Sequence, residues 1–187
     1  LLLAGDRSSV SDPTQHLRFG ERIARKLDGS ELVLQTDGIA LSPDRDWLYY
    51  RPLTDHHYWR IPTAALIDPE LSATELAARK QYLGDYALTG GLIMDGDGVL
   101  YGGDLEHHRV VALDPATREG KPALAQRVVV DDPASISWAD GFALQGNRLY
   151  FADSHLSEVN FSNGYPRRGR FTIFRIDLPT TPAKPAG

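Results

Sequence analysis

The sequence contains no cysteine among its 187 residues. It therefore has no disulfide framework and no thiol nucleophile. No apolar run approaches the ~18 residues that a membrane-spanning helix needs. No GxSxG motif, HExxH motif or glycine-rich phosphate loop occurs, so the sequence gives no support to the nucleophile and phosphate chemistries that these motifs carry.

Basic residues are also in the minority. The chain has 20 Lys and Arg against 25 Asp and Glu, which gives a formal net charge of −5. With no basic stripe, this balance argues against nucleic acid and against anionic membranes as partners. Residues 1–4 are too short, and lack the positive charge, to form a signal peptide.

What the sequence does contain is a unit of short strands that occurs three times. Its first copy, DGIALSPDRDWLYYRPLTDHHYWRIP, spans residues 37–62, and the unit returns at 90–115 and 140–156. Each copy holds runs of β-branched and aromatic residues bounded by turn formers, which is typical of strands. Glycines 38, 91 and 141 lie 53 and then 50 residues apart, and a Leu-Tyr pair recurs in every copy. A repeat of this length predicts the blades of a β-propeller.

We therefore expect an all-β fold in which residues 1–178 form about three propeller blades, near residues 37–62, 90–130 and 140–178. Propellers carry at least four blades and more often six or seven, so three blades cannot close a ring. The missing half is expected from the same protein or from a second chain. The proline-rich stretch 179–187 is expected to be disordered.

A short helical insertion is predicted near residues 63–83, between the first two copies of the repeat. Ser72 and Glu75 have the spacing of a capping box, and no helix breaker follows until Gly84. Such an insertion would cover one face of the propeller.

The N-terminal region is the least periodic part of the sequence. Residues 22–27 and 31–35, joined by an Asp-Gly pair, are predicted to form a hairpin that supplies outer strands to a blade. A short helix over residues 16–25 is the alternative.

Propeller topology indicates where chemistry could occur. The first strand of each blade is the innermost, so Asp37, Gly90 and Asp140 should surround the central channel on one face, and the turns after each second strand open onto that face. Carboxylates that converge there suit Ca²⁺, whereas imidazoles with carboxylates suit Zn²⁺ or iron. Two simpler interpretations compete: Asp-Gly pairs often cap turns, and histidines in exposed turns are usually solvated. The candidate ligand-binding residues are Asp37, His57, His108, Asp140, Asp153 and His155, and Asp37 and Asp140 are also the candidate metal ligands.

The amino-acid sequence of the repeats resembles that of a known family. The segments IPTAALIDPELS, GDLEHHRVVALDP, ISWADGFAL, LYFADSHL and FTIFRIDL, together with the first copy, are similar to bacterial members of the Yellow / major royal jelly protein family. The resemblance implies a six-bladed propeller, of which this chain would cover about half. More distantly, DGIAL and DGFAL are similar to the openings of gluconolactonase-like propellers. That likeness implies a divalent metal held at Asp37 and Asp140, with calcium as the candidate cofactor, although Gly90 stands where a third Asp is expected.

These observations favour a secreted or periplasmic propeller that binds a small molecule at the mouth of the channel. The alternative is a metal-dependent hydrolase of lactones or esters, in which a channel cation activates water. A third hypothesis is a scaffold whose partner supplies the other blades. Because no catalytic constellation is visible, the sequence leaves open whether the protein is an enzyme.

Overall fold

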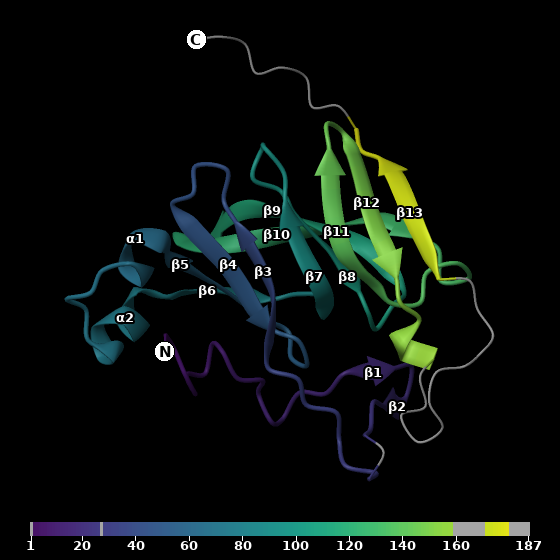
Figure 1. Cartoon of the computed structure of the whole chain (residues 1–187), viewed down its shortest axis with the longest axis horizontal. Coiled ribbons are helices and arrows are strands. Elements are labelled where there is room, and N and C mark those ends of the chain that lie inside the picture. The colour runs from purple at the N-terminus through teal and green to yellow at the C-terminus, as the bar shows by residue number, and fades with distance from the viewer. Residues whose placement is uncertain (1, 27, 159–170, 180–187) are drawn as a thin grey trace.

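The described part of the chain forms three antiparallel sheets that stand side by side as blades, and a separate two-stranded hairpin (Figure 1). The structure is a computed structural model, and it describes residues 2–26, 28–158 and 171–179. The expected disordered tail lies outside the described residues from position 180 onward. Strands far outnumber helices in the described part of the chain, so the all-β expectation is confirmed.

The first blade is a four-stranded meander. Strands β3 (Thr36–Leu41), β4 (Trp47–Pro52), β5 (His57–Pro62) and β6 (Gln81–Asp85) follow one another in space in this order. Between β3 and β4 the chain turns where Ser42 Nα–H donates to the Trp47 carbonyl at 2.9 Å. The strands thus begin and end at the turn formers that the sequence shows.

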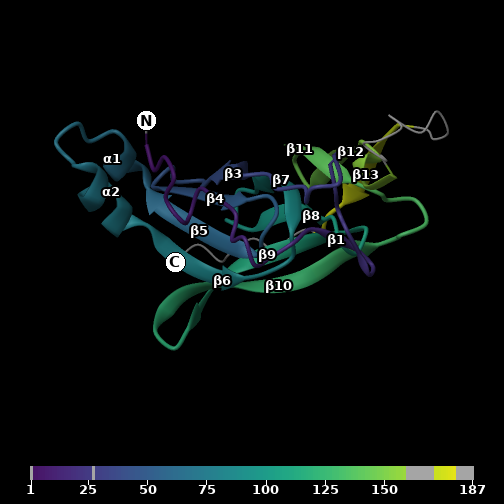
Figure 2. The ribbon, with the colours of Figure 1, turned by 90° about the horizontal axis from the view of Figure 1, so that it is seen from below.

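The helical insertion lies inside the first blade, between β5 and β6. It consists of α1 (Thr63–Leu66) and α2 (Ala73–Arg79), and the capping box at the start of α2 is confirmed. The helix ends earlier than residue 83 because residues from Gln81 onward pair with β5 as strand β6. Figure 2 shows both helices at one end of the molecule, with the third blade at the other end.

The second and third blades repeat the meander. The second has four strands and the third has three in the described part of the chain. The strands of the two blades are β7 (Thr89–Met94), β8 (Leu100–Asp104), β9 (Arg109–Arg118), β10 (Lys121–Asp131), β11 (Ala139–Gln145), β12 (Arg148–Asp153) and β13 (Thr172–Asp177). A short 3₁₀ helix, Leu156–Glu158, follows β12.

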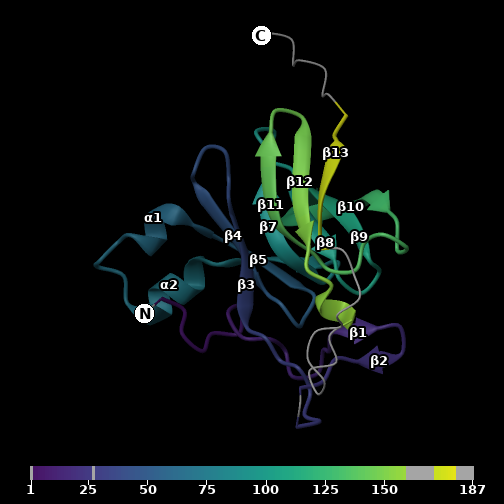
Figure 3. The same cartoon turned by 45° about the vertical axis from the view of Figure 1, so that its right-hand side comes forward.

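The N-terminal region differs from the expectation. Its hairpin joins β1 (Arg18–Phe19) to β2 (Arg22–Ile23), and the predicted pairing further on is reduced to a single bridge between Arg25 and Glu31. The hairpin joins no blade, and it lies beneath the second and third blades (Figure 3). Phe19 packs there against the cluster that contains the buried Leu105 and Trp138. This packing explains why the hairpin lies beneath the blades and does not extend one of them.

Apolar side chains fill the spaces between neighbouring blades. Leu100 and Leu113 are fully buried between the first and second blades, in contact with Tyr49. Tyr101 and Phe151 belong to the core between the second and third blades. Because each large aliphatic side chain in such a core contributes about 2–5 kcal/mol relative to alanine, the packing of the sheets is the main source of stability.

One face of the first blade is only partly covered. Tyr50 is buried there under Leu76 of α2, while Ile39 and Leu41 on the same face of β3 are 56% and 45% exposed. This face of β3 is therefore open in the described part of the chain.

Candidate functional site

Glycines bring the three inner strands close together at one end. Strand β7 lies between β3 and β11. A Cβ atom on Gly38 would lie 3.0 Å from the Gly90 carbonyl oxygen, and one on Gly91 would lie 2.5 Å from Asp140 Oδ1. A side chain at Gly90 would meet the Ala139 carbonyl at 3.3 Å. This contact is tight, so a side chain in place of Gly90 would require its neighbours to shift slightly.

Asp140 uses one carboxylate oxygen to hold this junction. Its Oδ1 accepts hydrogen bonds from the backbone N–H groups of Gly91 and Gly141, both at 2.7 Å. The other oxygen, Oδ2, accepts a long bond of 3.5 Å from Trp138 Nε1. Charge-assisted bonds to backbone amides are strong, so Asp140 links the inner strands of two blades. The turn-capping interpretation is confirmed for this residue.

Asp37 has a different environment. Its side chain is exposed, and no residue in the described part of the chain donates a hydrogen bond to its carboxylate. Loss of hydration raises the pKa of Asp37 above its usual value, and the nearby Asp140 carboxylate raises it further, while Arg51 acts in the opposite direction. Two like charges at the channel end therefore repel each other, which favours a bound cation or proton between them.

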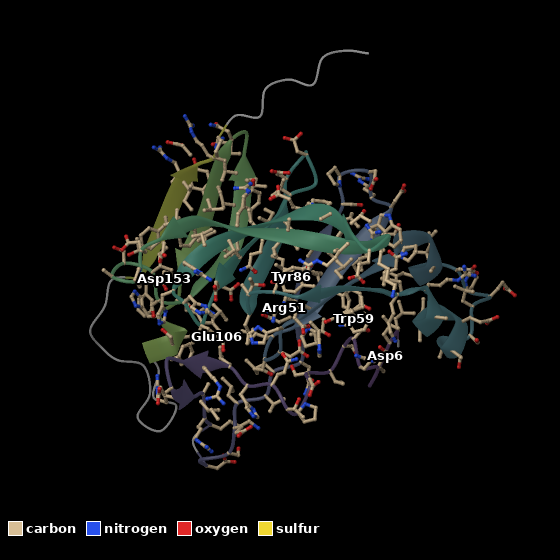
Figure 4. The ribbon with its side chains drawn as sticks, turned by 180° about the vertical axis from the view of Figure 1, so that it is seen from behind. Asp6, Arg51, Trp59, Tyr86, Glu106 and Asp153 are labelled. Carbon is tan, nitrogen blue, oxygen red and sulfur yellow. The ribbon has the colours of Figure 1, made fainter. Side chains whose placement is uncertain are left out.

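Arg51 is a residue that sequence reasoning missed. It lies on β4 opposite Gly38, is fully buried, and donates hydrogen bonds to the carbonyls of Thr89 and Asp55. Its guanidinium also lies 5.1 Å from the ring centre of Tyr58. Burial lowers the pKa of Arg51, with nearby tyrosine and carboxylate groups opposing that shift. Figure 4 shows it in the middle of the molecule, where it joins the first blade to the start of β7.

Asp153 organises the turn that follows β12. It is buried, and its carboxylate accepts bonds from the backbone N–H groups of Ser137 and Trp138, both at 2.7 Å, and of His155 at 3.1 Å. A carboxylate with three backbone donors is a structural anchor. His155 lies edge-on to Phe171, with ring centres 6.0 Å apart.

His57 lies in the corresponding turn of the first blade. Its backbone N–H and its Nδ1 both face the buried Asp55, at 2.9 and 3.3 Å, and its Nε2 lies 3.6 Å from Asp85. Gln15 also contacts Nε2, at 3.3 Å. The imidazole is thus held by neighbours of its own blade and by the N-terminal segment.

Two other histidines bond across the seams between blades. His56 donates from Nδ1 to the Tyr86 carbonyl at 2.9 Å, and His108 donates from Nδ1 to the Ser137 carbonyl at 2.8 Å. Both carbonyls belong to the segment that leads into the next inner strand. Because a carbonyl can only accept, both imidazoles carry a proton on Nδ1.

Each of these seams contains a cavity. The cavity between the first and second blades has a volume of about 340 Å³ and is lined by His56, Asp85, Glu106, His107 and Arg109, among others. The cavity at the next seam, of about 280 Å³, is lined by His108 and is bordered by the hairpin residues Phe19 and Arg22. The ring of Phe19 stacks on His108, with centres 6.1 Å apart.

The six candidate residues therefore fall into two regions. Asp37 and Asp140 lie at one end of the inner strands, near enough for their charges to interact. The other four, His57, His108, Asp153 and His155, lie in or next to the turns that follow the second strand of each blade. His57 and Asp153 have hydrogen-bond partners within the chain, and His108 lines a cavity. Glu106 and His56 are among the cavity-lining residues that were not candidates, and their only signal in the sequence is that each stands in the turn after the second strand of its blade.

No group of three or more His, Asp or Glu side chains is placed to hold a metal ion within residues 2–26, 28–158 and 171–179. Asp37 and Asp140 would thus supply two ligands, and one oxygen of Asp140 is already committed to backbone amides. None of the helices in the described ranges is long and apolar enough to cross a bilayer.

The sequence profile of the major royal jelly protein family matches residues 11–182. The chain belongs to this family. The match covers all three blades and the N-terminal hairpin, so the resemblance read from the repeats is confirmed. No curated protein sequence matches the chain.

Solved structures resemble the chain in fold. The luciferin-regenerating enzyme superposes with a TM-score of 0.50 at 14% identity, over 86% of this chain and 50% of that one. A gluconolactonase from Xanthomonas campestris gives 0.49 at 12% identity, over 95% and 54%. An aldose sugar dehydrogenase from Streptomyces coelicolor, solved with PQQ bound, gives 0.48 at 14%, over 92% and 54%. The chain thus spans about half the length of these structures, and the first likeness supports propeller blades.

Proposed function

We propose that this royal jelly family propeller binds a small cationic molecule at the channel end of β3, β7 and β11, with Asp37 as the main charged contact. The observation that carries the proposal is the position of the exposed Asp37 at the end of the inner strands, near enough to Asp140 for the two carboxylates to interact; loss of hydration and this second charge both raise the pKa of Asp37. A ligand with positive charge relieves both effects, because it replaces lost hydration and neutralises the repulsion.

The surroundings favour a ligand held by few polar groups. Gly38, Gly90 and Gly91 let the inner strands approach closely, which keeps the two carboxylates at the same end of these strands. Asp140 is fixed by Gly91 and Gly141 and cannot swing away. A rigid carboxylate beside an accessible one is suited to an ammonium group, while the rest of the ligand would contact the parts of the channel that lie beyond these blades.

A melting experiment tests the proposal. The purified protein is heated with tryptamine, an aromatic amine, in the presence of EDTA. Saturation at about 100 times Kd contributes about 2.7 kcal/mol, which raises Tm by about 5–10 °C for a chain of this size. Asp37→Asn is expected to remove the shift, because the amide keeps the shape and loses the charge.

Two controls make the result specific. Asp97→Asn changes an exposed acid in the hairpin turn between β7 and β8 and should leave the tryptamine shift intact. Tryptophol, in which a hydroxyl replaces the ammonium group, should give little shift. Equal stabilisation by tryptophol, or an undiminished shift in Asp37→Asn, would show that charge recognition at Asp37 is absent.

A metal-dependent hydrolase of lactones or esters is the second candidate. The same repulsion between Asp37 and Asp140 would favour a divalent cation, which could polarise a carbonyl and activate water. Hydrolysis of gluconolactone that requires calcium, stops with EDTA and is lost in Asp37→Asn would support it. Stabilisation by the amine that persists in EDTA would favour the binding protein instead.

A further inference from the structure

The seam between the first and second blades places an imidazole and a carboxylate face to face. His56 Nε2 and Glu106 Oε2 are 3.5 Å apart, too far for a good hydrogen bond. His56 Nδ1 carries its proton because it donates to the Tyr86 carbonyl. The other ring nitrogen, Nε2, therefore faces the Glu106 carboxylate oxygen, and a cation between these two atoms would contact both of them.

Both groups are held in place from behind. Tyr86 fixes the ring of His56 through the bond of 2.9 Å, and the backbone N–H of Arg18 on β1 donates to the other oxygen of Glu106 at 2.9 Å. Metal-binding histidines almost always donate their second ring N–H to such an acceptor, and metal-binding carboxylates are themselves hydrogen-bonded. Figure 4 labels Tyr86 and Glu106, which line the same cavity.

The distance fits a tetrahedral transition-metal ion. Zn²⁺ binds imidazole nitrogen at about 2.0–2.1 Å and carboxylate oxygen at about 2.0–2.2 Å, so two of its ligands lie about 3.4 Å apart. The cavity of about 340 Å³ leaves room for water or a ligand atom at the remaining positions. Only 33% of the His56 side chain and 13% of the Glu106 side chain are exposed, so both donors are partly desolvated.

The charge of the cavity also favours a cation. Asp104 is neutralised in place by Arg109, whose Nε lies 2.8 Å from its carboxylate, and His107 bonds the other oxygen at 3.0 Å. Glu106 and Asp85 then remain as acidic groups that line the cavity. A nitrogen donor disfavours calcium, which takes oxygen ligands.

We infer that His56 and Glu106 form a two-residue site for Zn²⁺ or a similar divalent transition metal at the seam of the first two blades. The site is separate from Asp37 and Asp140, so it can fail without affecting the amine proposal. An ion there would join the β4–β5 turn to the β8–β9 turn and would keep open coordination positions facing the cavity.

Calorimetric titration of the purified protein with zinc chloride tests the inference. We expect about one Zn²⁺ per chain, with affinity weakened at least about tenfold in His56→Ala and in Glu106→Gln. Glu106→Gln keeps an oxygen for the Arg18 amide, so it removes charge with little structural change. Co²⁺ should show the visible absorption of a tetrahedral complex, and calcium should not compete.

The matched control is another His and Glu pair. His16 Nδ1 contacts Glu31 directly at 2.9 Å, which leaves no room for a bridging ion, so His16→Asn should bind zinc as the unchanged protein does. Metal-free melting of each variant shows whether it is folded. Zinc affinity that is unchanged in Glu106→Gln, or lost equally in His16→Asn, would overturn the inference.

Discussion

Replacing Asp140 by alanine or by asparagine separates its structural role from its charge. In the alanine variant, the N–H of the half-buried Gly91 loses its acceptor, and the exposed Gly141 N–H turns to water. Removing one partner of a charge-assisted bond costs about 2–3 kcal/mol. That cost corresponds to a fall in Tm of about 5–10 °C for a chain of this size. The asparagine variant keeps an oxygen for Gly91 and relieves the repulsion on Asp37, so its loss should be less than half as large.

Urea unfolding at pH 7 measures both variants on the same scale. The two midpoints should differ clearly, with the alanine variant the less stable and the slope against urea unchanged. Midpoints that coincide would show that the bonds from Asp140 to the neighbouring strand contribute little. A stability in the alanine variant equal to that of the unchanged protein would refute the interpretation of Asp140 as a junction residue.

Three further predictions concern packing and titration. Gly103→Ala should lower the unfolding free energy by at least about 1–3 kcal/mol, since its Cβ would overlap the Ala139 carbonyl oxygen of β11. Gly96→Ala meets nothing within 4 Å and serves as the control in thermal melting. Arg51→Ala should cost at least about 3 kcal/mol in urea unfolding, because buried carbonyls lose their donor; a loss under 1 kcal/mol would contradict this. The raised pKa of Asp37 means that the folded state holds its proton more tightly than the unfolded state, so Asp37 reduces stability as pH rises from its unfolded to its folded pKa. NMR titration of its carboxyl carbon should show that pKa falling in Asp140→Asn, and no change would exclude the coupling.

The blades were predictable because their signals are local. Strands β3, β8 and β12 coincide with short runs of apolar residues that are bounded by turn formers, and such runs need no distant partner to be recognised. The capping box likewise placed the start of α2 correctly. The predicted end of α2 was wrong. Residues from Gln81 onward pair with β5 although their sequence allows a helix, and such pairing is a tertiary effect.

The site was harder to predict for a geometric reason. That Asp37 and Asp140 lie at the same end of the inner strands follows from the repeat alone, since they hold equivalent positions in it. His56 and Glu106 belong to different turns, and their approach depends on the rotation between two blades, which no spacing in the sequence specifies. The burial of Arg51 was not predictable, because a charged residue in a strand is normally exposed. The repeat gave no signal either, since the equivalent residue of the second blade is Gly103.

The pKa of Asp37 with and without tryptamine tests the proposed recognition most directly. Followed by NMR of the carboxyl carbons in EDTA, the pKa of Asp37 should fall when the amine binds, because the ammonium group stabilises the ionised carboxylate. The amine should also bind more weakly once Asp37 is protonated, as linkage requires. An Asp37 pKa that stays unchanged in protein saturated with tryptamine would contradict a cation site at the channel end.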